Sequence, residues 1–247
     1  MAVLVTRPDE QGSALCQLLI DAGIDALHQP LISIKPGSSL SGIDKELEQF
    51  DIIIAVSQHA VTFTHQMMLA SSSHWPKAAT YLAVGQKSAH VLSKNAQQKV
   101  HYPEISDSEH LLRLDVLQHV ANKRIVILRG NGGRDLIFDT LIKRGAKVEY
   151  REVYKRENIA FRSDLLIPLW QDRKVNQLVI TSSGQLNHFV SQLSELELDW
   201  LFKLTLYVPS ERIEREALQL GFKKVVNTYS ASNKDLLTAL RSTETGQ

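Results

Sequence analysis

Short runs of apolar, largely β-branched residues alternate along the chain with segments of helical periodicity. Seven such runs predict strands, and each is followed by small or polar residues and then by a predicted helix. Strands that alternate with helices at this spacing form βα units, whose strands lie parallel in a sheet. The pattern therefore predicts an α/β fold with ligand sites at the carboxyl ends of its strands. The predicted strands are residues 3–5, 52–56, 81–84, 125–128, 178–181, 204–208 and 224–226, and the predicted helices are residues 12–22, 59–69, 87–94, 134–144, 185–193, 211–220 and 234–240.

The second half of the chain resembles the first half. The matched pairs, in chain order, are residues 7 and 129, 23 and 145, 57 and 182, 85 and 209, and 111 and 236, which lie 122 to 125 positions apart. Matches in one order with little drift favour two structurally similar halves. The alternative is that any two series of βα units share such features.

Two further segments do not follow the parallel βα pattern. Residues 30–36 (PLISIKP) and 148–155 (VEYREVYK) follow the first helix of each half, and both can be extended. Pro30 and Pro36 disfavour a central position in a sheet for the first of them. Two extended connectors between two lobes, with a hinge and a cleft, are the simplest interpretation.

Composition excludes several classes of protein. The 247 residues include 28 Lys and Arg against 27 Asp and Glu, a formal net charge of +1, which argues against a broad surface for duplex DNA. Cys16 is the only cysteine, so it forms no intramolecular disulfide, and we expect it to be buried on a helix. No apolar run approaches the roughly 20 residues of a membrane helix. The first residues read as a strand rather than as a signal peptide, and we expect a cytoplasmic protein.

Polar and glycine-rich turns follow several of the predicted strands. Residues 128–135 (LRGNGGRD) leave a strand and open a helix, where backbone amides favour a phosphate or carboxylate. The segment matches neither a P-loop nor G-x-G-x-x-G, and its glycines can equally serve a tight connection. Other strand-to-helix turns carry hydroxyl groups that either cap the helix or bind a ligand, namely Ser57, Ser88, Ser182, Ser183 and Ser210.

Neither a metal site nor a nucleic-acid site is indicated. The nine histidines include no His-x-x-x-His pair, and aromatic residues make up 6% of the chain without a basic and aromatic stripe. Tyr154 lies in the second connector, where a phenol either packs or donates a hydrogen bond into a cleft.

Seven of these segments together resemble the uroporphyrinogen-III synthase family, in the family's order and over nearly the whole chain. They are residues 5–8 (VTRP), 55–61 (AVSQHAV), 83–85 (AVG), 127–134 (ILRGNGGR), 153–154 (VY), 179–182 (VITS) and 208–212 (VPSER). The resemblance implies two similar parallel-sheet α/β lobes joined by a two-stranded antiparallel connector. The implied first lobe is residues 1–29 and 160–247, the second is residues 37–147, and the connector strands are residues 30–36 and 148–159.

The resemblance also implies a reaction and its residues. Members close linear hydroxymethylbilane to uroporphyrinogen III with inversion of the terminal pyrrole ring and loss of water, a lyase step of heme biosynthesis without metal or organic cofactor. Tyr154 matches the tyrosine near the leaving hydroxyl and is predicted to donate a proton or hydrogen bond. The residues predicted to bind the polycarboxylate substrate are Arg7, Ser57, Gly85, Ser88, Arg129, Gly130, Gly132, Gly133, Arg134, Ser182, Ser183 and Ser210.

Other functions stay open at this point. Pro209 stands where several members have glycine, which removes a backbone donor. The hinge and the glycine-rich turn would also suit a noncatalytic two-lobed protein that binds a small anion. A nucleotide-dependent transferase is disfavoured by the missing phosphate motifs. We expect a monomer, since nothing in the sequence demands an oligomer.

Overall fold

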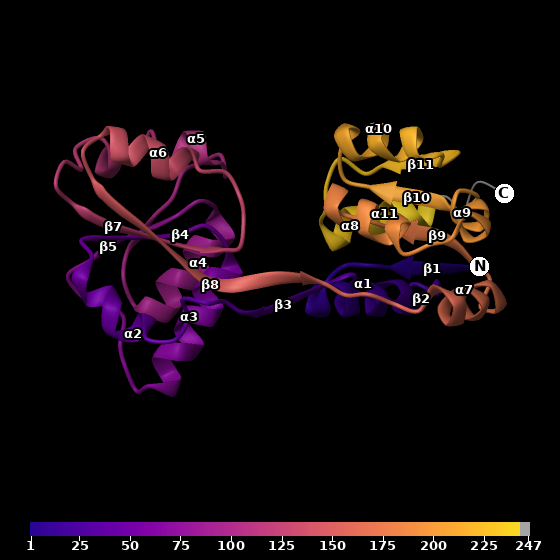
Figure 1. The fold of residues 1–247 in the computed structure, drawn as a ribbon, viewed down its shortest axis with the longest axis horizontal. Helices are drawn as coiled ribbons and strands as arrows, with labels where there is room; N and C mark the ends of the chain where they lie inside the picture. Colours follow the sequence, from indigo (N-terminus) through magenta and orange to yellow (C-terminus); the bar gives the residue numbers. More distant parts are fainter. Residues whose placement is uncertain (243–247) are drawn as a thin grey trace. The chain divides into compact units, whose positions relative to one another are not determined.

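The computed structural model describes residues 1–242 and contains two compact units (Figure 1). Unit 1 comprises Met1–Ile34 and the residues from Glu157 onward, and unit 2 comprises Lys35–Arg156. The chain leaves unit 1 within strand β3 (Ile32–Pro36) and returns within strand β8 (Lys147–Asn158). Unit 1 is therefore discontinuous in sequence, whereas unit 2 is a single segment.

Unit 1 is built on a five-stranded sheet in the order β11-β10-β9-β1-β2, in which every neighbouring pair is parallel. Strand β1 is buried throughout because its side chains alternate between two cores. Leu4 packs in a cluster with Phe189, and Val3 packs in another with Leu15. The strands are β1 (Ala2–Val5), β2 (Asp25–His28), β9 (Val175–Val179), β10 (Thr205–Val208) and β11 (Lys224–Asn227), and the helices are α1 (Asp9–Asp21), α7 (Ser163–Asp172), α8 (Ser183–Ser191), α9 (Glu195–Leu201), α10 (Glu211–Leu220) and α11 (Asn233–Ser242).

Unit 2 is built on a six-stranded sheet in the order β3-β8-β7-β4-β5-β6. The pairings among β4, β5, β6, β7 and β8 are parallel. One core of the unit buries two isoleucines from each of two strands, Ile52 and Ile54 of β4 and Ile125 and Ile127 of β7. The remaining strands are β4 (Ile52–Ala55), β5 (Thr80–Ala83), β6 (Val100–His101) and β7 (Arg124–Gly130), the α-helices are α2 (Ile43–Glu46), α3 (Gln58–Ala70), α4 (Gln86–Ala96), α5 (Ser108–Leu111) and α6 (Leu136–Lys143), and the 3₁₀ helices are η1 (Leu47–Gln49) and η2 (Asp115–Leu117).

The two sheets repeat one strand order. When the order β11-β10-β9-β1-β2 of unit 1 is aligned with the order β6-β5-β4-β7-β8 of unit 2, β1 is equivalent to β7 and β9 is equivalent to β4. The sequence repeat matches the same strands. Residue 7 follows β1 and its match, residue 129, lies in β7, whereas residue 57 follows β4 and its match, residue 182, follows β9. The prediction of two similar parallel-sheet α/β units is confirmed. Cys16 is buried in α1, as expected.

The prediction that residues 148–155 stand outside the parallel pattern is wrong. Strand β8 pairs in parallel with β7 from Lys147 onward, with Val148 in the core of unit 2. The strand is 12 residues long, so its first part completes the sheet and its later part continues beyond it. The proline-bearing β3 lies at the edge of the sheet, where a missing backbone donor costs least.

Backbone hydrogen bonds also connect β8 and its continuation with the β3 segment. In unit 2 the amide of Gly37 donates to Val153, and in unit 1 the amide of Ile159 donates to Leu31. Residue numbers rise along the β3 segment while those of its partners in β8 and its continuation fall, so the two segments are antiparallel. Within residues 1–242, no helix is both long enough and apolar enough to span a bilayer.

Candidate active site

A cavity of about 210 Å³ opens in unit 2 at the carboxyl ends of β4 and β7, beside β8. This is the edge at which parallel sheets place their ligands. Seven of the predicted site residues line it, namely Ser57, Arg129, Gly130, Gly132, Gly133, Arg134 and Tyr154. The cavity is also lined by three residues that the sequence pattern did not predict, Ser108, Tyr150 and Arg156.

Tyr154 is only 1% exposed and lines this cavity together with Ser57 and Arg156, the two residues that contact its hydroxyl group. Its ring packs on α3, with ring centroids 5.5 Å from His59 and 6.3 Å from Phe63. The phenol oxygen accepts hydrogen bonds from Ser57 Oγ at 3.1 Å and from Arg156 Nη2 at 3.0 Å. Because two donors already point at this oxygen, its own O–H remains to donate to a bound molecule.

Ser57 fills one of the two roles considered for a serine at this turn, the helix cap, and it also contacts Tyr154. Its backbone is extended, and its Oγ accepts the amide of Ala60 at 3.2 Å, which caps α3. The same hydroxyl group donates to Tyr154. The cap therefore fixes the serine that orients the phenol.

The glycine-rich turn needs its glycines for reasons of space and backbone conformation. A Cβ at Gly130 would lie 2.5 Å from the Tyr154 ring, closer than any real contact. Gly132 and Gly133 have φ angles of +80° and +122°, which other residues rarely adopt. Because the turn extends to Asp135, α6 begins at Leu136 rather than at Arg134 as predicted.

Arg129 forms a fixed wall of the cavity. Its guanidinium is nearly buried, donates to Asp135 Oδ1 at 3.1 Å and lies 4.2 Å from the centre of the Tyr150 ring. Tyr150 also donates to Asp135, at 2.9 Å. The hydrogen bonds from Arg129 and then Tyr150 lower the pKa of Asp135 below its usual range. Burial, followed by the hydrogen bond to Asp135, raises the pKa of Tyr150 to about 12, so neither group changes charge near neutrality.

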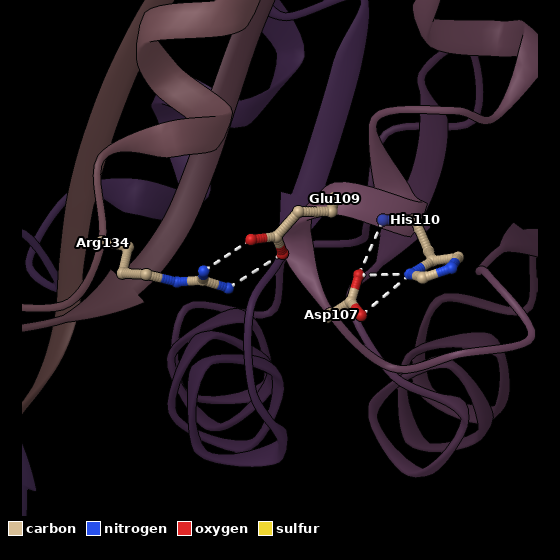
Figure 2. A network of polar contacts seen from close by, with 4 residues as sticks. All are labelled: Asp107, Glu109, His110 and Arg134. Atoms are coloured by element: carbon tan, nitrogen blue, oxygen red, sulfur yellow. Dashed lines mark hydrogen bonds and ion pairs between the residues drawn. The ribbon is translucent and has the colours of Figure 1, made fainter.

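Arg134 connects the glycine-rich turn to α5. Figure 2 shows Arg134 and Glu109 pointing toward each other, and their two hydrogen bonds measure 2.7 and 3.0 Å. Asp107 caps α5 by accepting the amide of His110 at 2.7 Å, and it also contacts the His110 ring (Figure 2). The hydrogen bond from Arg134 lowers the pKa of Glu109, and the backbone hydrogen bond from His110 is the main cause that lowers the pKa of Asp107.

Comparison with known proteins decides the family. The family model described as uroporphyrinogen-III synthase HemD matches residues 13–238. The chain belongs to the uroporphyrinogen-III synthase family. It is 38% identical to the uroporphyrinogen-III synthase of Escherichia coli (strain K12) and 36% identical to that of Salmonella typhimurium, in each case over 98% of this chain and all of the relative. A mutant of the uroporphyrinogen III synthase of the extremely thermophilic bacterium Thermus thermophilus, at 17% identity, has the same fold with a TM-score of 0.65 over 99% of this chain and all of that one.

The remaining residues that the family resemblance predicted do not line this cavity. Gly85 and Ser88 lie at the start of α4 in unit 2, where a Cβ at Gly85 would come within 3.0 Å of Ser106. The other four belong to unit 1: Arg7, Ser182, Ser183 and Ser210. Substrate binding stays a prediction for these six residues and equally for those that line the cavity.

Three of the four unit 1 residues have local side-chain hydrogen bonds. Arg7 is buried, and its guanidinium donates to Gln11 at 2.7 Å and to Asn233 at 2.6 Å; burial lowers its pKa. Ser182 caps α8, and Ser183 accepts a hydrogen bond from Arg212 at 2.7 Å. Ser210 occupies the N-cap position of α10 but makes no side-chain cap hydrogen bond there.

Strand alternation is the signal that could have identified Tyr150 and Arg156. Side chains two residues apart in an extended segment share a face, so Tyr150, Tyr154 and Arg156 were candidates for one surface. The identification needs the register of β8, which shifts by one residue opposite Arg129 and Gly130. Within the described part of the chain, no group of three or more His, Cys, Asp or Glu side chains could hold a metal ion.

Proposed function

We propose that this chain is a lyase that closes linear hydroxymethylbilane to uroporphyrinogen III, with inversion of the terminal pyrrole ring and loss of water. Membership of the family and 38% identity to the Escherichia coli enzyme over nearly the whole chain support the proposal. The observation that carries it is the hydroxyl group of Tyr154, a cavity-lining residue, whose oxygen accepts hydrogen bonds from two other lining residues. The proposed enzyme acts as a cytoplasmic monomer without a metal or organic cofactor.

The first step needs a modest proton donor rather than a strong nucleophile. The C–O bond of the hydroxymethyl group breaks, and the oxygen leaves with the bonding electron pair and takes the Tyr154 proton to form water. The pyrrole nitrogen lone pair supplies electrons to the carbon, which gives an azafulvenium cation. Loss of its N–H proton, with Tyr154 as the acceptor, gives the neutral azafulvene and restores the phenol.

Ring inversion follows from geometry. Attack on this azafulvene by the substituted carbon of the terminal ring gives a spiro intermediate, which fragments and closes again in the inverted sense. Spontaneous closure gives the uninverted isomer, so the protein must hold a folded substrate that excludes direct closure. Small-molecule sites typically have volumes of about 300–1,000 Å³. The volume of this cavity is smaller and suits one end of a four-ring substrate.

The acetate and propionate groups of the substrate suit the polar groups at this edge of the sheet. Arg129, Arg134 and Arg156 line the cavity beside the glycine-rich turn, whose backbone amides can also donate to carboxylates. Local positive charge of this kind needs no large net charge, which agrees with the value of +1.

The variant Tyr154→Phe tests the proposal. It removes the proton donor but keeps the ring that packs on α3, so we expect the rate of formation of the inverted isomer to fall about 100-fold. The measurement is isomer-resolved chromatography after incubation with hydroxymethylbilane, with circular dichroism as the control for folding. A folded variant that forms the inverted isomer at the wild-type rate would remove Tyr154 from the mechanism.

A further inference from the structure

Three arginines line the cavity, and they differ in their partners. The guanidinium of Arg129 is paired with Asp135, and that of Arg134 is paired with Glu109. The guanidinium of Arg156 donates to the Tyr154 hydroxyl at 3.0 Å and lies 5.3 Å from the centre of the same ring. Within residues 1–242 it has no carboxylate partner. Arg156 is therefore the cavity arginine whose positive charge is not already neutralised by an acidic side chain.

The backbone of Arg156 is held against the glycine-rich turn. The Asn131 side chain accepts the Arg156 amide at 2.7 Å and donates to the Arg156 carbonyl at 3.1 Å. This pair of hydrogen bonds fixes the residue at the point where β8 passes the turn. Because Arg156 follows Tyr154 by two positions in an extended strand, both side chains are on one face. An exposed arginine is thus held in place at both its backbone and its guanidinium.

We infer that Arg156 is both a positioning residue for Tyr154 and a binding residue for a substrate carboxylate. Its Nη2 donates to the phenol oxygen, so that the phenol proton is directed toward the substrate, and its other N–H groups are available for a carboxylate. The inference rests on the proposed function. One side chain, Arg156, then contacts both the Tyr154 oxygen and a substrate carboxylate. A substrate whose carboxylate binds Arg156 therefore has its leaving hydroxyl group next to Tyr154.

The guanidinium also has an electrostatic effect during the reaction. When Tyr154 gives its proton to the leaving hydroxyl, the phenol oxygen gains negative charge in a buried position. A cation that already donates to this oxygen stabilises that charge without further rearrangement. Loss of Arg156 should therefore lower kcat through Tyr154 and raise KM through the carboxylate, and these two effects can be separated.

A double-mutant cycle between Arg156→Met and Tyr154→Phe separates them. In the wild-type background we expect Arg156→Met to lower kcat for the inverted isomer about tenfold and to raise KM about tenfold. In the Tyr154→Phe background, Arg156→Met should change kcat by less than about twofold relative to Tyr154→Phe alone, because the phenol oxygen that Arg156 contacts is absent. It should still raise KM. Arg156→Lys keeps the charge and should recover part of the KM effect.

Arg113→Met is the matched control, because Arg113 is an exposed arginine of unit 2 that does not line the cavity. It should leave both constants unchanged. Equal losses of kcat in both backgrounds would show a merely structural effect and overturn the positioning role, and an unchanged KM would overturn the carboxylate role. Wild-type protein that forms no inverted isomer would instead refute the proposed function.

Equilibrium binding keeps the inference testable if the double variant turns over too slowly. Anaerobic titration with uroporphyrinogen III, followed by tryptophan fluorescence, should show about tenfold weaker binding for Arg156→Met. Tyr154→Phe and Arg113→Met should bind as the wild type does. Wild-type affinity in Arg156→Met would overturn the carboxylate contact independently of any rate.

Discussion

The position of Tyr154 depends on the residues that surround its ring. Gly130 lies against that ring so closely that even one added methyl group would overlap it. Ser57 and Arg156 hold the oxygen from two directions, and α3 supports the ring. At the residue scale the site is therefore a buried phenol whose hydroxyl direction is set by close packing and by two donors.

Gly130→Ala tests this packing. The Cβ would displace the Tyr154 ring, and we expect a loss of stability of about 1–3 kcal/mol together with a fall of at least tenfold in formation of the inverted isomer. Urea unfolding and isomer-resolved assays measure the two effects. Gly184→Ala is the control, because a Cβ there meets nothing within 4 Å and its helix should be slightly stabilised. A Gly130→Ala protein with wild-type stability and rate would contradict the geometry described here.

At the scale of elements, the sequence pattern identified the strands that form the centre of each sheet. These strands are continuous buried apolar runs, which periodicity detects well. The pattern missed β2, because that strand is half-exposed, and β6, because it has two residues. It missed α7, which contains Pro168, a residue that disfavours helix interiors. Helix α9 has a capping box between Ser194 and Glu197, a pattern of residue types that marks a helix start in the sequence.

The candidate site was predictable in part for a related reason. Tyr154 and the glycine-rich turn stand out in the sequence, and the parallel fold brings Ser57 to the same edge. The contribution of Arg156 depends on the register shift of β8 and on the hydrogen bonds from Asn131, and both are tertiary features. The partners of Arg129 and Arg134 depend on tertiary contacts in the same way.

The contact between α5 and the glycine-rich turn gives a prediction at this scale. The hydrogen bond from Arg134 is the main cause that lowers the pKa of Glu109. The ion pair is therefore intact at any pH above the ordinary pKa range of a carboxyl group, and it is lost only as the pH falls below that range. In Arg134→Gln we expect the pKa of Glu109 to rise toward its ordinary value. Carboxyl carbon NMR titration measures this change, and Arg162→Gln, in a surface pair with Asp164, is the control. A Glu109 pKa that does not change in Arg134→Gln would show that the ion pair is absent in solution.

At the scale of the whole molecule, the two units share one strand order, but their equivalent residues have different contacts. Ser57 caps α3 and donates to Tyr154, whereas the matched Ser182 caps α8. Arg129 lines the cavity of unit 2, whereas the matched Arg7 is hydrogen-bonded to Gln11 and Asn233. The repeat therefore supplies two similar scaffolds, and the phenol belongs to one of them.

The isomer formed by the wild-type protein is the most direct test of the synthase activity. Freshly prepared hydroxymethylbilane is incubated with the purified full-length chain, without added metal or cofactor, and the cyclised products are oxidised and separated as isomers. We predict that the inverted isomer, uroporphyrinogen III, dominates and that its rate of formation is proportional to protein concentration. A product mixture identical to that of the protein-free reaction, in which the uninverted isomer dominates, would contradict the account.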